Sequence, residues 1–296
     1  MFIIKYKKIF VSISVVLVIL SIGAISYFGL NMGIDFKGGS LTEVEYTTVR
    51  PEQGVVESSL STLSIGQALI QPIGEKGYSI KTRDITDGEH QAILKSLGAD
   101  AVEKSFTSIG PSVGAELVRK SILSFILVSL GIIFWIAFSF RKVSKPVSSW
   151  RYGLIAIVTL IHDIMIPVGV FAVLSHIYGV EVDTLFVVAI LTVLGLSVSD
   201  TIVVFDRIRE NIRVGHWKTF EETVGNSIAQ VYTRSIATSA TVIIALLALV
   251  LFGPKSTKVF AMMLTAGMFF GTYSSIFLAS PLLVFVENWQ KKKTKN

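Results

Sequence analysis

Six apolar stretches constrain this chain more than any other feature of its sequence. A helix that spans a bilayer needs about 20 mostly apolar residues. The stretches that fit are Ile9–Leu30, Ser121–Phe140, Tyr152–Ile177, Leu185–Phe205, Ser235–Phe252 and Val259–Val286. Only 16% of the residues are charged, whereas soluble domains have roughly 25%. We therefore predict a polytopic α-helical membrane protein with six transmembrane helices.

The basic residues predict how these helices are oriented. The first apolar run follows Lys5, Lys7 and Lys8 and is longer than the roughly 7–15 residues of a signal-peptide core, so we expect it to be a retained span. Lys and Arg gather at both termini and in the loops after the second and fourth spans, which places these parts in the cytoplasm. The net charge of +6 is then a topology signal, and we expect no nucleic-acid partner.

The one large segment between spans, residues 31–120, predicts a small domain outside the membrane. Its pattern favours the order β-α-β-β-α-β of a split ferredoxin-like α+β domain. The expected elements are Ser40–Thr47, Pro51–Leu63, Ala68–Ile73, Tyr78–Arg83, Asp87–Leu97 and Ala101–Ile109. The predicted organisation is thus residues 1–30 with the first span, 31–120 outside, 121–286 with five spans, and a basic cytoplasmic tail at 287–296.

Asp200 is a carboxylate inside the fourth apolar stretch. A charge at the bilayer centre costs about 2.5–3.5 kcal/mol on insertion scales, so we expect a functional role for it. Its candidate partners are the His162-Asp163 pair and Arg234. Asp200 precedes Asp206 by six positions, which places it about 9 Å inside the helix end and within reach of Arg234. A static ion pair with Arg234 is the alternative, and Asp163 could instead be satisfied beside its own helix.

Small and polar residues recur at helical spacing in three of the spans. Stripes in which small residues recur every fourth position permit close helix contact in lipid. The residues we assign to helix packing or to a polar lining are Gly195, Ser197, Ser199, Thr201, Thr238, Gly267 and Gly271. Helix contact explains the glycines, and a path for water or protons is the alternative for the polar residues of the fifth span.

Two connecting regions have open interpretations. Gly38-Gly39 and Gly110-Pro111 flank the predicted outer domain, and they indicate either turns at the membrane surface or a hinge. Residues 206–230 predict an interfacial amphipathic segment with Trp217 as a headgroup anchor, or alternatively a surface for a cytoplasmic partner.

The sequence contains no signature of catalysis. It has no cysteine, no Walker A motif and no GxSxG elbow, and its four histidines are scattered. We therefore expect no enzyme activity, no cofactor and no metal site. Energy would have to come from an ion gradient or from a partner.

Several sequence blocks together resemble the SecF family of bacterial protein export. They are Gly33–Gly39, Ile109–Leu117, His162-Asp163, Leu191–Asn211, Thr233–Ser235 and Gly271–Ser275, in this order along the chain. The fourth-span block reads Gly-Leu-Ser-Val-Ser-Asp-Thr at residues 195–201, whereas the family usually has Gly-Tyr-Ser-x-Asn-Asp-Thr. The resemblance covers nearly the whole chain.

The resemblance implies half of a transporter of the RND type, with SecD as the other half. It also implies the SecYEG translocon and exported preproteins as partners, in the bacterial cytoplasmic membrane. In this interpretation Asp200 relays protons, Arg234 is its charge partner, and Asp163 is a secondary polar group. The alternatives are a small-molecule or lipid exporter half, and a structural scaffold of the translocon without ion conduction.

Overall fold

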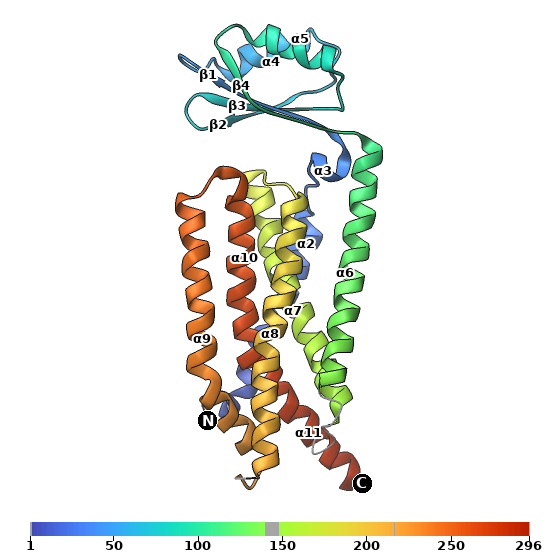
Figure 1. Ribbon diagram of the computed structural model, residues 1–296, viewed down its shortest axis with the longest axis vertical. Helices are drawn as coiled ribbons and strands as arrows, with labels where there is room; N and C mark the ends of the chain where they lie inside the picture. Colours follow the sequence, from blue (N-terminus) through green and yellow to red (C-terminus); the bar gives the residue numbers. More distant parts are fainter. Residues whose placement is uncertain (1, 140–147, 216, 296) are drawn as a thin grey trace. The chain divides into compact units, whose positions relative to one another are not determined.

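The computed structural model describes residues 2–139, 148–215 and 217–295, and these form two compact units. One unit comprises residues 32–123 and the other comprises the rest. Six described helices are long and apolar enough to span a membrane, as predicted from the sequence. They are α2 (Lys7–Phe28), α6 (Pro111–Ser139), α7 (Ser149–Tyr178), α8 (Thr184–Val214), α9 (Phe220–Phe252) and a last span made of α10 (Lys255–Ser274), η1 (Ser275–Ala279) and α11 (Ser280–Lys295) (Figure 1).

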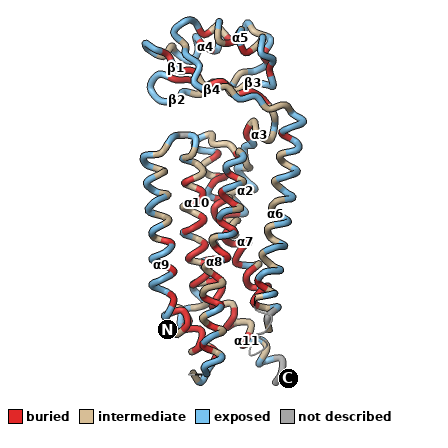
Figure 2. The backbone as a smooth tube through the Cα atoms, viewed as in Figure 1, coloured by how far each residue is buried: buried red, intermediate tan, exposed pale blue. Residues whose placement is uncertain are grey.

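The helical unit has its core where α7, α8 and α10 meet. Buried residues run along these three helices, whereas α9 is mostly exposed (Figure 2). The helix α2 lies against α7, where a Cβ atom built on Gly169 would lie 2.5 Å from the Cβ atom of Ser21. Small residues thus permit a close contact between these two helices. Both ends of the described chain lie at the same end of this unit (Figure 1).

The last span is interrupted by a single π-helical turn, Ser275–Ala279. The hydroxyl of Ser280 donates a hydrogen bond of 3.2 Å to the backbone oxygen of Ser275, five residues earlier. Single π turns inside α-helices frequently mark functional sites. This turn directly follows the polar residues of α10 described below.

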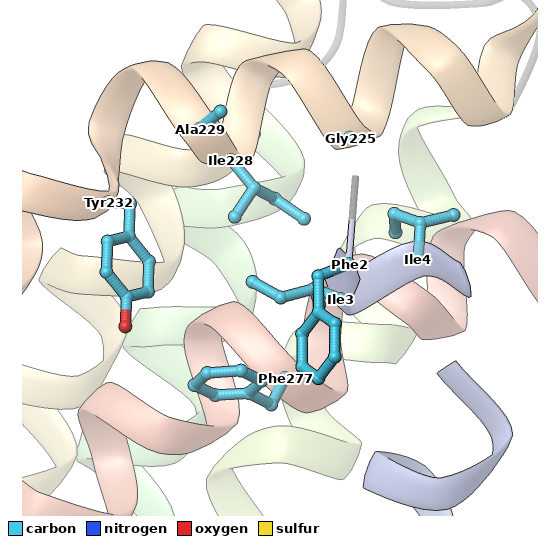
Figure 3. Close-up of a pocket in the computed structure, with 8 residues that line it drawn as sticks. All are labelled: Phe2, Ile3, Ile4, Gly225, Ile228, Ala229, Tyr232 and Phe277. Atoms are coloured by element: carbon cyan, nitrogen blue, oxygen red, sulfur yellow. The ribbon is translucent and has the colours of Figure 1, made fainter. Parts of the chain in front are cut away.

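A short first helix, α1 (Phe2–Lys5), packs against α9. Its side chains line a cavity of about 390 Å³ together with residues of α9 and η1, among them Ile228, Tyr232 and Phe277 (Figure 3). The Nζ atom of Lys7 also lies 2.6 Å from Oε1 of Glu221. Residues 2–5 are therefore part of the folded bundle.

Residues 206–230, for which we expect an interfacial amphipathic segment, span the junction of α8 and α9. Helix α8 continues to Val214 and α9 begins at Phe220, so the segment consists of the joined ends of two long helices. Ile208 and Val224 are fully buried, and Asn211 donates a hydrogen bond of 2.8 Å to Ser227 across the hairpin. Ile208 and Val224 therefore belong to the apolar core of the helical unit.

Some expected boundaries differ or cannot be compared. Helix α11 continues through Lys295, so the predicted basic tail begins as part of the last helix. The expected end of the second span at Phe140 and the basic loop residues Arg141, Lys142 and Lys145 lie outside the described residues, as does the last residue, Asn296.

Residues 32–123 form a four-stranded antiparallel sheet with two helices and a short turn of helix. The elements are α3 (Ile34–Lys37), β1 (Gly39–Tyr46), α4 (Gln53–Ser61), β2 (Leu69–Ile73), β3 (Gly77–Thr82), α5 (Asp87–Leu97) and β4 (Ala101–Ile109). The strand order is β2-β3-β1-β4. Val44 and Ile80 of the sheet pack with Leu60 and Ile93 of α4 and α5 in one apolar core.

A capping box begins α5. Thr86 accepts a hydrogen bond from the backbone of Glu89, and Glu89 accepts one of 2.8 Å from the backbone of Thr86. The backbone bond from Thr86 and the side-chain bond from Arg83 hold the pKa of Glu89 below its usual value. Local chemistry thus specifies the start of this helix.

The predicted hinge glycines lie where two segments of residues 32–123 meet closely. Gly38 has a φ of 77°, and a Cβ atom on it would lie 2.9 Å from the Cα atom of Pro111. Gly39 has a φ of 137°, and its Cβ atom would lie 2.7 Å from the backbone oxygen of Thr82. Only glycine fits such positions without strain. Gly110 has more room, since its nearest neighbour would be Asp84 at 3.6 Å.

Candidate ion-coupling site

Asp163 lies at the centre of the helical unit and is fully buried. It is carried by α7 and accepts hydrogen bonds from two other helices. Its Oδ2 atom accepts a bond of 2.8 Å from Ser274 on α10 and a short bond from Ser197 on α8. Its Oδ1 atom lies 2.8 Å from Nδ1 of His162. Both carboxylate oxygens are therefore engaged, by side chains from three helices.

Asp200 lies on α8, one turn beyond Ser197, and is partly buried. Its Oδ2 atom accepts bonds from Thr272 on α10 at 3.3 Å and from Ser239 on α9 at 3.4 Å. These contacts are long, whereas Thr272 and Ser239 lie only 2.6 Å apart. Asp200 is thus held more loosely than Asp163.

The two carboxylates belong to one polar layer across the bundle. Neighbouring positions on α8 serve both acids, since Ser197 contacts Asp163 and Asp200 follows three residues later. Thr201 completes the layer by sharing a hydrogen bond of 2.9 Å with Ser275. Hydroxyl groups both donate and accept, so the same partners can bind a carboxylate or a carboxylic acid. This chemistry suits reversible proton uptake.

The structure does not bring Arg234 and Asp200 together. Among the described residues, the ion pairs include none between these two side chains. The residue of α9 that faces Asp200 is Ser239, which is five positions, or about 7.5 Å, further along the helix than Arg234. Arg234 is exposed and lines a cavity of about 370 Å³ with Asp206 and Glu210. The expected contact is therefore not formed.

The predicted small residues divide into two groups. Gly267 and Gly271 lie where α10 crosses α8, and Cβ atoms there would come within 2.1 Å of Val193 and 3.1 Å of Ser197. Gly195 instead has nothing within 4 Å of its Cβ position. It lies with Ser199 on the exposed side of α8. The stripe on α10 is a helix contact within this chain, and the stripe on α8 is not.

Of the polar residues of the fifth span, Ser239 contacts Asp200, whereas Thr238 lies on the exposed side of α9. Thr238 is exposed, and its backbone oxygen accepts a bond of 2.7 Å from Thr241. The neighbouring Ser239 is buried and reaches Asp200. Buried positions on α9 recur as Val231, Ser235 and Ser239, and this stripe excludes both Arg234 and Thr238.

Thr272 and Ser274 are site residues that the sequence analysis did not single out. The signal was present, because the run from Thr272 to Ser275 is polar within an otherwise apolar span. Its partners could not be assigned without knowing which side of α10 faces α7 and α8. Among the described residues, no group of three or more histidines and acids is arranged to hold a metal ion.

Two family models match this chain. The model described as "Protein export membrane protein SecD/SecF, C-terminal" matches residues 89–289, and that of the "SecD/SecF GG Motif" matches residues 24–48. The first match includes Asp163, Asp200 and Arg234. The second includes Gly38 and Gly39.

Curated relatives match over nearly their whole length. A protein of Thermobaculum terrenum named protein translocase subunit SecF is 42% identical, over 97% of this chain and 94% of its own. The protein of the same name from Anaerolinea thermophila is 36% identical, over 98% and 96%.

Two solved structures share the fold. The crystal structure of SecDF from Thermus thermophilus, described as a translocon-associated membrane protein, matches with a TM-score of 0.82 and 28% identity over 96% of this chain. A second SecDF structure, in a super-membrane-facing form, matches with a TM-score of 0.71 and 27% identity. This chain spans only 38% and 39% of those two chains.

Proposed function

This chain belongs to the SecD/SecF family of protein-export membrane proteins, and we propose that it acts as the SecF-type subunit of the Sec export machinery. Relatives named SecF match it over almost their full length. They favour this function over a small-molecule or lipid exporter half of the RND type and over a passive scaffold. The expected products of its action are exported polypeptides, so the chain is a transport component and not a catalyst.

SecD is the partner that we infer first. The SecDF structures contain a counterpart of this chain in less than half of their length, which leaves room for a SecD part. Large apolar side chains of α6 and α9 are exposed, among them Phe134, Trp135 and Leu251. In a bilayer such faces contact lipid or another membrane subunit. The SecYEG translocon and exported preproteins are the further partners in this proposal.

The proposed orientation in the bacterial inner membrane has both termini in the cytoplasm and the domain of residues 31–120 outside. The asymmetry of Lys and Arg supports it. We classify the outer unit as ferredoxin-like, because its β-α-β-β-α-β order and antiparallel strand order β2-β3-β1-β4 match that arrangement. Gly38 and Pro111 abut each other, so this junction would move together with the outer unit if the unit swings.

Proton transfer through the polar layer is the coupling that we infer. Asp200 is the proposed relay, because its partners are hydroxyls at long distance that can adapt to either protonation state. Asp163 is the proposed second acid, one helical turn away through Ser197. Arg234 would act from the cavity that it shares with Asp206 and Glu210, as a charged group at the cytoplasmic entry to the layer.

The observation that carries this proposal is the polar layer in which two membrane carboxylates accept hydrogen bonds from hydroxyl groups of three helices, and one of the two also contacts an imidazole. A test is to replace Asp200 by Asn in the complete export complex. Asn keeps the volume and one acceptor oxygen, but it does not bind and release a proton near neutral pH. We expect assembly to persist and the proton-driven stimulation of export to disappear.

The matched variant is Asp200→Glu, which retains a carboxylate and should keep part of the stimulation. The measurement is the rate of protein export into membrane vesicles, with and without an imposed proton gradient, for the Asp200→Asn and Asp200→Glu variants. Full stimulation by the Asn variant would overturn the relay.

A further inference from the structure

Two residues of α10, one on either side of Tyr273, bind the two acids of the polar layer. Thr272 reaches Asp200 on α8 at 3.3 Å, and Ser274 reaches Asp163 on α7 at 2.8 Å. Successive residues of an α-helix point about 100° apart, so the two hydroxyls leave α10 on different sides. Both contacts therefore depend on the rotation of α10 about its own axis.

Tyr273 joins α10 to α2, a helix that carries neither acid. Its hydroxyl donates a hydrogen bond of 3.1 Å to the backbone oxygen of Phe10, and the hydroxyl of Ser14, about one turn further along α2, also interacts with it. The acceptor is part of the backbone of α2, so it does not move with a side-chain rotamer. The bond therefore ties the position of α10 to that of α2 itself.

The ring of Tyr273 is packed independently of this hydrogen bond. It stacks on Phe277 of η1 with 5.1 Å between ring centroids and on His162 of α7 with 6.3 Å. Phe277 in turn lies 4.7 Å from the ring of Phe10. Aromatic rings at such separations attract each other. The ring packing thus directs the hydroxyl toward α2, and removal of the hydroxyl alone leaves that packing in place.

The two hydroxyls beside Tyr273 each have a second acceptor within their own helix. Thr272 lies 2.9 Å from the backbone oxygen of Met268, and Ser274 lies 3.0 Å from that of Gly271. A hydroxyl group carries one hydrogen, so it donates fully either to its own backbone or to the acid. A small rotation of α10 is enough to change this choice.

We infer that Tyr273 is a positioning residue for the ion-coupling site. Its bond to Phe10 holds α10 in the rotation at which Thr272 and Ser274 donate to the acids instead of to their own backbone. The tyrosine takes no proton itself and acts only through its two neighbours in the sequence. This role rests on the proposed proton coupling.

The test is Tyr273→Phe in the complete export complex, with the pH profile of proton-driven export as the readout. The variant keeps the ring and loses the bond to α2. Hydroxyl donors favour the ionised form of a carboxylate, so we expect the midpoint of the profile to move to higher pH when they leave the acids. The midpoint does not depend on the amount of assembled complex, so a partly unstable variant still reports it. An unchanged midpoint, or one at lower pH, would overturn the inference.

The matched control is Tyr78→Phe in the sheet unit. It removes a bond of the same kind, because the hydroxyl of Tyr78 donates to the backbone oxygen of Pro51 at 2.7 Å. We expect its midpoint to equal that of the wild type. An equal shift in both variants would show that the loss of any such bond moves the profile, and the special role of Tyr273 would be wrong.

A double-mutant cycle separates positioning from a direct effect of the tyrosine. The ionisable groups beside the changed contacts are Asp163 with its neighbour His162, and Asp200. If Tyr273 acts through Thr272, then Tyr273→Phe should shift the midpoint less in a chain that already carries Thr272→Val than in the wild type. Fully additive shifts would contradict this route.

Asp200→Asn distinguishes a failure of this inference from a failure of the proposed function. If Asp200→Asn is not stimulated by the proton gradient while Tyr273→Phe has the profile of the wild type, the role of Tyr273 is wrong and the coupling through Asp200 stands. If Asp200→Asn keeps full stimulation, the proposed function itself fails.

Discussion

Ser239 on α9 and Thr272 on α10 share a hydrogen bond of 2.6 Å, and both hydroxyls reach the same oxygen of Asp200. Two helices therefore meet the carboxylate through one hydroxyl pair. Any change in the charge of Asp200 alters what this pair can donate, so the contact between α9 and α10 is linked to the state of the acid.

The first prediction concerns this pair. Thr272→Val keeps the shape of the side chain but removes its hydroxyl, so Asp200 and Ser239 lose a partner. We expect proton-driven export to fall and the folded complex to lose about 1 kcal/mol of stability. Thr265→Val is the matched control, because Thr265 lies on the same helix and bonds only to its own backbone, at 2.7 Å from Ala261. Equal effects of both variants would contradict a special role for Thr272.

The second prediction concerns Asp200 and Arg234. Since the structure forms no ion pair between them, Asp200→Asn and Arg234→Gln should change stability independently. We expect the double mutant to equal the sum of the single mutants within about 0.5 kcal/mol. Thermal unfolding of the purified complex measures this cycle.

The alternative, a static buried pair, makes a different forecast. Loss of Asp200 would then leave an unpaired buried charge and cost about 3–5 kcal/mol, and the second mutation would recover most of it. Recovery of assembly and export in the double mutant would show that the pair forms in another state of the protein.

Part of the fold follows directly from the sequence. The six spans and the α5 boundaries at Asp87 and Leu97 agree with the prediction because length, apolar content and capping are local properties. The side of each helix that packs against its neighbours is not a local property of the sequence. Arg234 and Ser239 both lie in the fifth span, and only the packing of α9 on α8 decides which of them meets Asp200.

The small residues make the same point. Gly195 and Gly267 belong to similar stripes in the sequence, yet only Gly267 lies at a contact within this chain. A stripe of small residues indicates that another helix can approach closely, but it does not identify that helix.

The third prediction follows from this contrast. Gly267→Ala would place a Cβ atom 2.1 Å from Val193, so α8 and α10 must separate. We expect a loss of about 1–3 kcal/mol, as is typical of overpacking. Gly195→Ala should be nearly neutral in the isolated chain, because its Cβ position is open. Thermal unfolding in detergent compares the two, and Val193→Ala combined with Gly267→Ala should regain stability.

The fourth prediction concerns the sheet unit. Gly39→Ala forces an L-residue into a φ of 137° and against the backbone oxygen of Thr82. We expect faster proteolysis of residues 32–123 in the full-length protein. Gly54→Ala in α4 is the control, since its Cβ atom would meet nothing within 4 Å and alanine favours a helix by up to about 1 kcal/mol. Equal resistance of both variants to protease would show that the strand begins differently.

The π turn at Ser275–Ala279 makes the last span two helices of different phase. A π turn holds about one residue more than an α turn, and one residue corresponds to about 100° of rotation. The α10 side chains that contact the two acids and the buried side chains of α11 around Glu287 therefore follow two different helical phases, one before the turn and one after it. Deleting a single residue within the turn would rotate α11 by about 100° relative to α10. The turn therefore determines which side of α11 faces the bundle when α10 is in contact with the two acids.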